Sequence, residues 1–194
     1  MAKVGYLRSL LPIAMLILSS GKVSAQGEPY HGDGVDDYLR FAPIAAVYVM
    51  KAAGVEGASS WKRLIVNSAA SFAITTGVTW SLKHAVDDTR PDLTDDDAFP
   101  SGHSAYAFAG ATVLHKEYGR VSPWISVAGY AVATATAVDR VCRNRHNWDD
   151  VVVGAAIGIL STEVGYWIGD KITGERSRYS VGVTTSGVSL AINL

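Results

Sequence analysis

Four long segments with few or no charged residues alternate with charged connections along the chain. Leu39 to Ala53 is apolar apart from two cations, and Leu64 to Leu82 contains no charged residue. The runs from Pro123 to Val138 and from Val151 to Ile168 carry a single acid between them. Apolar segments of this length, separated by polar connections, are typical of helices rather than strands. We therefore expect an all-α domain, a bundle of five or six helices.

Start and stop residues indicate where these helices begin and end. Pro43 fits the first turn of the first helix, and Trp61 to His84 is the longest periodic segment. Ser101 is a natural N-cap for a helix that ends at Tyr118, before Gly119. The helices are rich in Gly, Ala, Ser and Thr, which allow close packing, so the longest one is expected at the centre of the bundle rather than facing lipid.

The two ends of the chain differ from this helical body. Residues 1–25 have Lys3 and Arg8 before a short apolar core and end in small residues, which predicts a cleaved secretory signal and an exported protein. The tail, residues 179–194, alternates apolar and polar positions about a Thr-Ser-Gly turn and predicts a short β-hairpin. We expect one helical domain over residues 26–178 between them.

Composition excludes some functions and leaves others open. The chain is 48% hydrophobic with a net charge of −1, which provides ample core and gives no basic balance for nucleic-acid binding. The single cysteine, Cys142, excludes an internal disulfide. A cysteine-phosphatase loop would need an arginine six positions later, where Trp148 stands, so we predict that Cys142 is a small buried residue.

A cluster of reactive side chains lies between Arg140 and Asp150, directly before the last apolar segment. His146 and Asp150 are four residues apart, so they share a helix face if the helix begins at or before Arg145. A carboxylate on one ring nitrogen leaves the other basic, as a nucleophile or general base requires, and Arg140 could hold an anion against it. Taken alone, the spacing favours the simpler interpretation, an ordinary polar turn at a helix start.

Two further clusters suit phosphate. Lys83 and Arg90 form one, and Ser101, Gly102 and His103 form the other at a helix start. Arginine offers a planar fork, lysine a point charge and the first helical turn oriented amides. One histidine could then attack phosphorus while the other protonates the leaving oxygen. The simpler interpretation is that Lys83 is a solvated helix end and Ser101 only a cap.

In order and spacing, the three clusters resemble the motifs of the type 2 phosphatidic acid phosphatase (PAP2) superfamily. The matching pieces are Lys83-x6-Arg90-Pro91, Pro100-Ser101-Gly102-His103 and Arg140-x5-His146-x3-Asp150. The resemblance implies that His146 is the phosphorylated nucleophile, Asp150 its orienting partner and His103 the general acid. It implies a phosphate cradle of Lys83, Arg90, Ser101, Gly102 and Arg140. One residue departs from the pattern, because Asp139 stands where the family often has Ser.

The function implied by the resemblance is a metal-independent phosphatase without a cofactor, acting on a phosphate monoester or diphosphate. The acidic connection from Ala85 to Phe99 lacks the alternation of a calcium loop, so we expect a solvent-facing loop there. Export and the uncharged runs favour a membrane lipid as substrate, of the lipid A or undecaprenyl phosphate or diphosphate type. We expect the protein to associate with the periplasmic side of the inner membrane.

Three alternatives remain open at this point. A soluble periplasmic acid phosphatase would need the same signal and the same site. A vanadium-dependent haloperoxidase resembles this family in its anion site, although the chain is short for one. A non-catalytic phosphate-binding membrane protein would need the cations but not two histidines and a matched aspartate.

Overall fold

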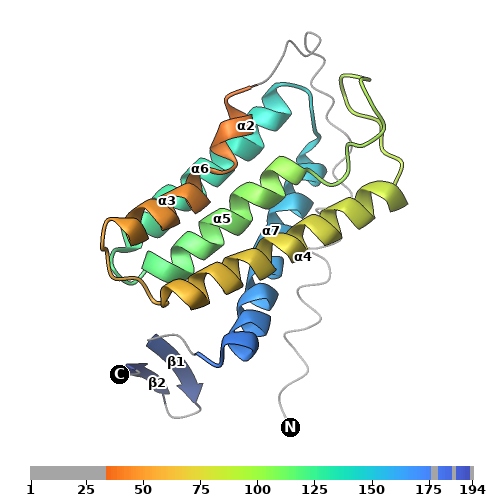
Figure 1. The fold of residues 1–194 in the computed structure, drawn as a ribbon. Helices are drawn as coiled ribbons and strands as arrows, with labels where there is room; N and C mark the ends of the chain where they lie inside the picture. Colours follow the sequence, from red (N-terminus) through yellow and green to blue (C-terminus); the bar gives the residue numbers. More distant parts are fainter. Residues whose placement is uncertain (1–33, 176–178, 185–186, 193–194) are drawn as a thin grey trace.

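The computed structural model describes residues 34–175, 179–184 and 187–192, and its body is a bundle of helices (Figure 1). This confirms the predicted all-α class. Six helices lie in the described part: α2 Asp36–Leu39, α3 Ala42–Ala52, α4 Trp61–Ala85, α5 Gly102–Tyr118, α6 Pro123–Cys142 and α7 Trp148–Thr173.

The predicted helix signals are confirmed where they depend on local chemistry. Pro43 lies in the first turn of α3, and Ser101 caps α5 by accepting the Ser104 N–H. α6 continues past the uncharged run and carries Arg140 in its last turn, because a helix end can hold charges that the bundle interior excludes. The one-turn helix α2 was not predicted, since its residues read as a polar connection.

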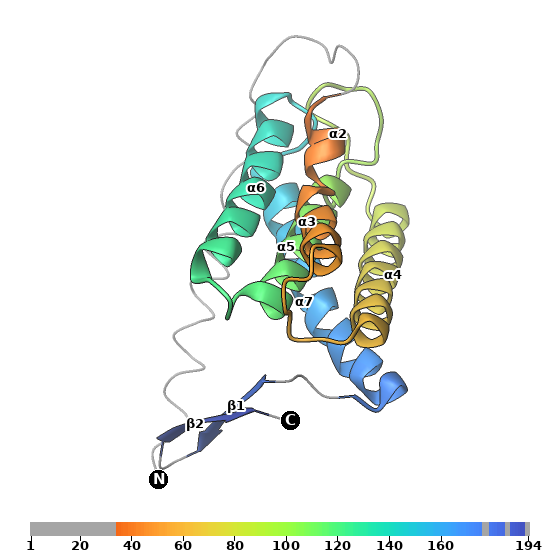
Figure 2. The same cartoon turned by 60° about the vertical axis from the view of Figure 1, so that its left-hand side comes forward.

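Helix α5 runs through the middle of the bundle, with α3 and α6 on one side and α4 and α7 on the other (Figures 1 and 2). The expectation that the segment from Trp61 to His84, α4, is the central helix is therefore wrong. The α5 alanines Ala105, Ala107, Ala109 and Ala111 are fully buried. Small side chains let several neighbouring helices approach the same helix closely. The larger apolar residues gather toward the end of α5, in a cluster of Val47, Leu64, Val113, Leu114, Tyr118 and Tyr166.

Helix α7 is placed by four glycines along its length. A Cβ on Gly158 would lie 2.3 Å from the carbonyl oxygen of Ala105 in α5, and one on Gly165 would lie 2.4 Å from Ser71 Oγ in α4. Gly154 and Gly169 make equally close approaches to α5 and α4. The expected close packing through small residues is therefore confirmed, and no larger residue fits at these positions without moving a helix.

The start of α4 is joined to the end of α7 by a bidentate ion pair. Arg63 donates from Nε to Asp170 Oδ1 at 2.8 Å and from Nη2 to Oδ2 at 3.0 Å. Close by, His115 Nδ1 in α5 lies 2.8 Å from Ser126 Oγ in α6. These polar contacts fix the end of the bundle opposite the sequence clusters.

Three further predictions concern Cys142 and the two ends of the chain. Cys142 is exposed at the end of α6, so the expectation that it is buried is wrong. Strands β1 Tyr179–Thr184 and β2 Gly187–Ile192 pair antiparallel. The turn between them lies outside the described residues, and the hairpin stays a prediction. The predicted secretory signal, residues 1–25, also lies outside them.

Replacing Gly165 by valine should destabilise the bundle, because its Cβ would also lie 2.6 Å from the backbone N and Cα of Ser71. We expect a loss of about 1–3 kcal/mol in unfolding free energy, the usual cost of overpacking. Thermal unfolding of the purified protein measures it. Gly77→Ala is the matched control, because a Cβ at Gly77 meets nothing within 4 Å and the helix should gain stability. Equal melting temperatures for the two variants would contradict the packing account.

Candidate active site

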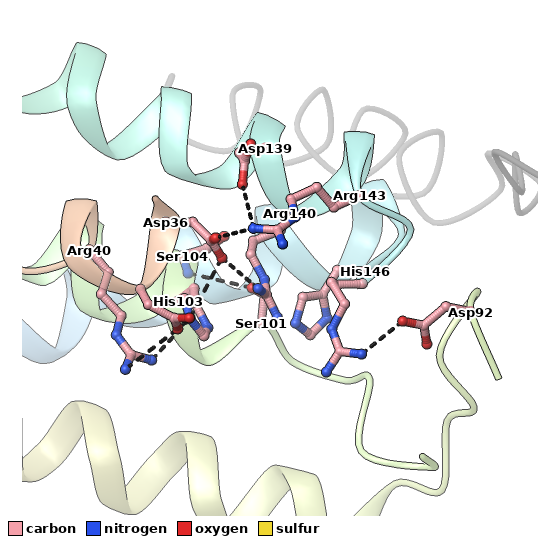
Figure 3. Close-up of polar contacts among 12 residues, drawn as sticks. Asp36, Arg40, Asp92, Ser101, His103, Ser104, Asp139, Arg140, Arg143 and His146 are labelled. Carbon is pink, nitrogen blue, oxygen red and sulfur yellow. Dashed lines mark hydrogen bonds and ion pairs between the residues drawn. The ribbon is translucent and has the colours of Figure 1, made fainter. Parts of the chain in front are cut away.

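The three sequence clusters meet at one end of the bundle, where α4 and α6 end and α5 and α7 begin. Figure 3 shows residues of two of them, Ser101 and His103 beside Arg140 and His146. Lys83 lies in the last turn of α4 and Arg140 in the last turn of α6. Arg90 comes from the connection between α4 and α5. The cap Ser101 and the first-turn residues Gly102 and His103 begin α5, and His146 precedes α7.

His146 lies inside this site and is only 2% exposed. Its Nε2 is 3.3 Å from Arg90 Nη1, and its Nδ1 is 3.5 Å from Asp150 Oδ2. The condition for a shared helix face, a helix that begins at or before Arg145, is not met, because α7 begins at Trp148. His146 and Asp150 therefore meet across the helix start, close enough to interact electrostatically but farther apart than a hydrogen bond.

Asp150 has a structural task besides its proximity to His146. Its Oδ2 accepts the backbone N–H of Asn147 at 2.8 Å, which forms half of a capping box at the start of α7. Its carbonyl accepts the backbone N–H of Ser101 at 3.0 Å, which joins the starts of α5 and α7. The Ser101 amide, predicted as a phosphate donor, is thus already used. The first-turn amides of Gly102 and His103 are the better placed donors.

The surroundings of His146 keep its ring unprotonated. Burial lowers the pKa of His146 well below its usual value, and the positive charges of Arg90, Arg140 and Lys83 lower it further. The neutral imidazole retains a lone pair near neutral pH, as an attacking nitrogen requires. Lys83 itself donates to the carbonyl of Asp97, and burial lowers the pKa of its ammonium.

Arg140 is held by Asp36, a residue that the sequence clusters do not include. Asp36 is fully buried, and its carboxylate accepts from Arg140 Nη1 and, at 2.8 Å, from Arg143 Nη1. Burial alone would raise the pKa of Asp36, but the hydrogen bond and charge of Arg140 outweigh it and lower the pKa. Asp139 lies beside this group, with Oδ2 3.9 Å from Arg143 Nη1. The predicted acid near the anion site is therefore present.

His103 makes its side-chain contacts through a single nitrogen. Nε2 lies 2.7 Å from Asp37 Oδ1 and 3.0 Å from Arg40 Nη1. Burial and the charges of Arg140 and Arg40 outweigh the opposite effects of Asp37 and Asp36 and lower the pKa of His103 to about 4. Both histidines of the site thus lie among charges, His146 fully buried and His103 partly buried.

Comparison with known families decides what kind of site this is. Residues 64–173 match the model of the PAP2 superfamily, a range that includes all three clusters. The chain belongs to the PAP2 superfamily. The resemblance inferred from the motifs is therefore confirmed.

Individual relatives of this PAP2 chain are also known. A lipid A 1-phosphatase of Porphyromonas gingivalis is 42% identical over 151 residues, which make up 77% of this chain and 34% of that protein. The chain therefore spans about a third of the length of this relative. The crystal structure of Aquifex aeolicus LpxE is similar with a TM-score of 0.48 and 24% identity, covering 82% of this chain and 86% of that one.

The acidic connection between α4 and α5 is anchored to the site. Asp92 accepts from Arg145 Nη1 at 2.8 Å, and its side chain is only 1% exposed. Asp95 accepts from Arg90 Nε. The expectation of a solvent-facing loop is therefore wrong for Asp92, although Asp87 is exposed. This anchoring fixes the Arg90 guanidinium beside His146.

Sequence reasoning missed three charged residues of this PAP2 site, Asp36, Asp37 and Arg40. Asp36 and Asp37 lie far before the clusters in the chain, and no spacing rule joins them to His103 or Arg140. The one local signal was a charged residue at the edge of an apolar segment, as Arg40 is. Arg143 and Arg145 lie inside the predicted cluster from Arg140 to Asp150, but their contacts with Asp36 and Asp92 were not predicted.

Ligand atoms of Asp36, Asp37 and His103 lie within 4.8 Å of one another, a grouping that could hold a metal ion. The same atoms, however, contact the guanidinium groups of Arg140, Arg143 and Arg40. Three positive charges at this distance repel a cation and attract an anion. The arrangement therefore favours binding of an anion over binding of a metal ion.

His103 should make stability depend on pH. Its folded pKa of about 4 lies below its usual 6.5, so the unfolded chain binds the proton more readily. The associated stability is present above pH 6.5 and is lost as pH falls toward 4, up to about 3 kcal/mol at 1.36 kcal/mol per unit. His103→Gln should therefore flatten the fall in melting temperature over this range. Parallel curves for the two proteins would contradict the shift.

Proposed function

We propose that the protein is a phosphatase that removes a phosphate group from a membrane lipid through a phosphohistidine on His146. The observation that carries this proposal is the buried, unprotonated imidazole of His146 between Arg90 and Asp150. A protein that only binds phosphate needs cations, whereas a desolvated imidazole backed by a carboxylate is suited to covalent attack.

In the first step, Nε2 of His146 attacks phosphorus. The nitrogen–phosphorus bond forms as the bond to the leaving oxygen breaks, and the proton of His103 passes to that oxygen. The leaving group is an alcohol from a monoester or a phosphate from a diphosphate. Positive charge develops on the His146 ring, and Asp150 beside Nδ1 stabilises it.

In the second step, water attacks the phosphohistidine. His103, now unprotonated, accepts a proton from the water as the nitrogen–phosphorus bond breaks. Inorganic phosphate leaves, and both histidines regain their starting states. The sum of the two steps is hydrolysis of one phosphate ester or anhydride bond.

The charge of the transferred phosphoryl group would be balanced by protein groups without a metal ion. Lys83, Arg90 and Arg140 supply cations, and the effect of all three on the pKa of His146 supports their proximity to its ring. The Gly102 amide and the Ser101 hydroxyl at the start of α5 complete the proposed cradle.

The outer surface of the bundle supports a membrane location. All five tryptophans are exposed, by between 48% and 75%, although tryptophan is normally well buried. Trp61 and Trp80 are nineteen residues apart on α4, and Trp148 and Trp167 are nineteen apart on α7. Each pair spans about 28 Å of helix. A bilayer's hydrocarbon core is about 30 Å thick with tryptophans at both interfaces.

Between these tryptophans the exposed surface is largely apolar, although Lys62 and Thr76 on α4 are also exposed. It includes Ile65 and Val78 on α4, Val127 and Val138 on α6, and Val152, Leu160 and Val164 on α7. Glu163 is the charged exception on α7, and Lys116 pairs with it at 2.7 Å. Of the helices in the described residues, only α7 is long and apolar enough by composition to cross a membrane. A soluble acid phosphatase has no use for such an apolar surface.

Lipid A is the substrate type that we favour. The P. gingivalis relative is a lipid A 1-phosphatase, and its 42% identity includes most of this chain. Undecaprenyl phosphate or diphosphate is the second candidate, because its phosphate lies at the same membrane depth. The predicted export signal favours action at the periplasmic side of the inner membrane.

His146→Ala should abolish turnover, because no other group would form the covalent intermediate. His103→Ala should slow alkyl phosphates by about a hundredfold or more but aryl phosphates much less, because only an alkoxide leaving group needs the proton. Release of phosphate from alkyl and aryl esters of matched chain length measures both effects. Substantial activity in His146→Ala would overturn the nucleophile assignment.

A lipid phosphatase should lose activity steeply on short-chain analogues. Each buried methylene contributes about 0.8 kcal/mol, so removing several should lower kcat/KM by orders of magnitude. A chain-length series in detergent micelles, with membrane fractionation of the expressed protein, tests this. A freely soluble protein that hydrolyses glycerol phosphate as well as lipid phosphates would instead indicate a soluble acid phosphatase.

A further inference from the structure

The short helix α2 brings two consecutive carboxylates to the site, and they make different contacts. Asp36 is bound by Arg140 and Arg143, so its charge is balanced by two guanidinium groups. Asp37 instead lies 2.7 Å from Nε2 of His103, at ion-pair distance if the ring is protonated. No function has so far been assigned to Asp37.

We infer that Asp37 is a positioning residue for His103, which holds the ring in place and favours the protonated form that can give a proton to the leaving group. This inference rests on the proposed phosphatase function. The site would then contain two histidine–aspartate pairs, His146 with Asp150 and His103 with Asp37. The first carboxylate favours charge on the nucleophile, and the second favours the proton on the acid.

Two contacts compete for the same nitrogen of His103. Arg40 Nη1 lies 3.0 Å from Nε2 and can donate only when that nitrogen carries no hydrogen. Asp37 can only accept, so its contact requires the hydrogen to be present. The imidazolium form is repelled by Arg40 and attracted by Asp37, so Asp37 is the partner that matters while His103 acts as the acid.

The surroundings make this carboxylate necessary. His103 is partly buried and faces the cations Arg140 and Arg40, which disfavour a further positive charge. The carboxylates that oppose this effect are those of Asp37 and Asp36. Asp36 is shared with two arginines and lies 3.7 Å from Nε2. Asp37 makes the closer contact to His103, and its ion pair with Arg40 is longer, with 3.8 Å between Oδ1 and Nη2.

The test measures phosphate release by the full-length protein in detergent from an alkyl and an aryl phosphate of matched chain length. Asp37→Asn should lower the alkyl rate by about ten- to a hundredfold, part of the hundredfold or more that a general acid contributes. The aryl rate should change less than about twofold, because its leaving group needs no proton. The ratio of the two rates is independent of how much protein folds. Asp37→Glu should recover part of the alkyl rate.

Asp87→Asn is the matched control, because it removes an exposed carboxylate from the connection near the same site and should leave the ratio unchanged. In a His103→Ala background, Asp37→Asn should cost nothing further, since its effect acts through that ring. Equal losses on both esters, a further loss without His103, or an unchanged ratio would each overturn the inference. A faster Asp37→Asn enzyme would also overturn it and show that Asp37 obstructs the site.

The proposed function has a separate point of failure. If the wild-type protein releases no phosphate, or if His146→Ala retains activity, the phosphatase mechanism itself is wrong. If both histidines are required but Asp37→Asn leaves the ratio of alkyl to aryl rates unchanged, the phosphatase function is supported and the positioning role of Asp37 is wrong.

Discussion

The close approach of α7 to α5 is the constraint on which the rest of the site depends. A Cβ on Gly154 would lie 2.4 Å from the carbonyl oxygen of Ser101, so only glycine lets the two helix starts meet. At this distance the Asp150 carbonyl accepts the Ser101 amide, and both helix starts become one rigid unit. His146 and His103 flank this unit, one before α7 and one in the first turn of α5. Backbone packing thereby sets the geometry that the proposed chemistry needs.

Electrostatics then divides the site between two differently charged surroundings. Around His146, three cations and burial keep the ring neutral, with Asp150 as the nearby carboxylate. Around His103, the carboxylates of α2 oppose the arginines, although burial and the arginines together outweigh them. A group that must attack needs a free lone pair, whereas a group that must protonate needs a hydrogen. The proposed roles, with His146 as the nucleophile and His103 as the acid, therefore depend on the difference between these surroundings and not on either histidine alone.

The sequence predicted what depends on local pattern and spacing. The helices, the Ser101 cap and the position of Pro43 follow from apolar periodicity and capping chemistry, and the three clusters of the site lie together as their motifs imply. Asp36 and Asp37 could not be predicted, because only the folded chain brings α2 to the ends of α5 and α6. His146 and Asp150 were expected to meet on one face of a helix. Instead, His146 precedes the helix, and the capping box between Asn147 and Asp150 holds the carboxylate near its ring. The burial of Asp92 depends on Arg145, more than fifty residues away.

The position of the site at the bundle end follows from the cost of burying charge. A cluster with two histidines and several arginines and aspartates would be very unfavourable at the middle of a bilayer. Trp80 and Trp148 lie near the site end of α4 and α7, where the proposed hydrocarbon boundary would fall. The phosphate of a membrane lipid lies at that boundary as well. The proposed substrate, a lipid with its phosphate at the interface and its hydrocarbon chains below it, would make charged chemistry compatible with an apolar outer surface in one small bundle.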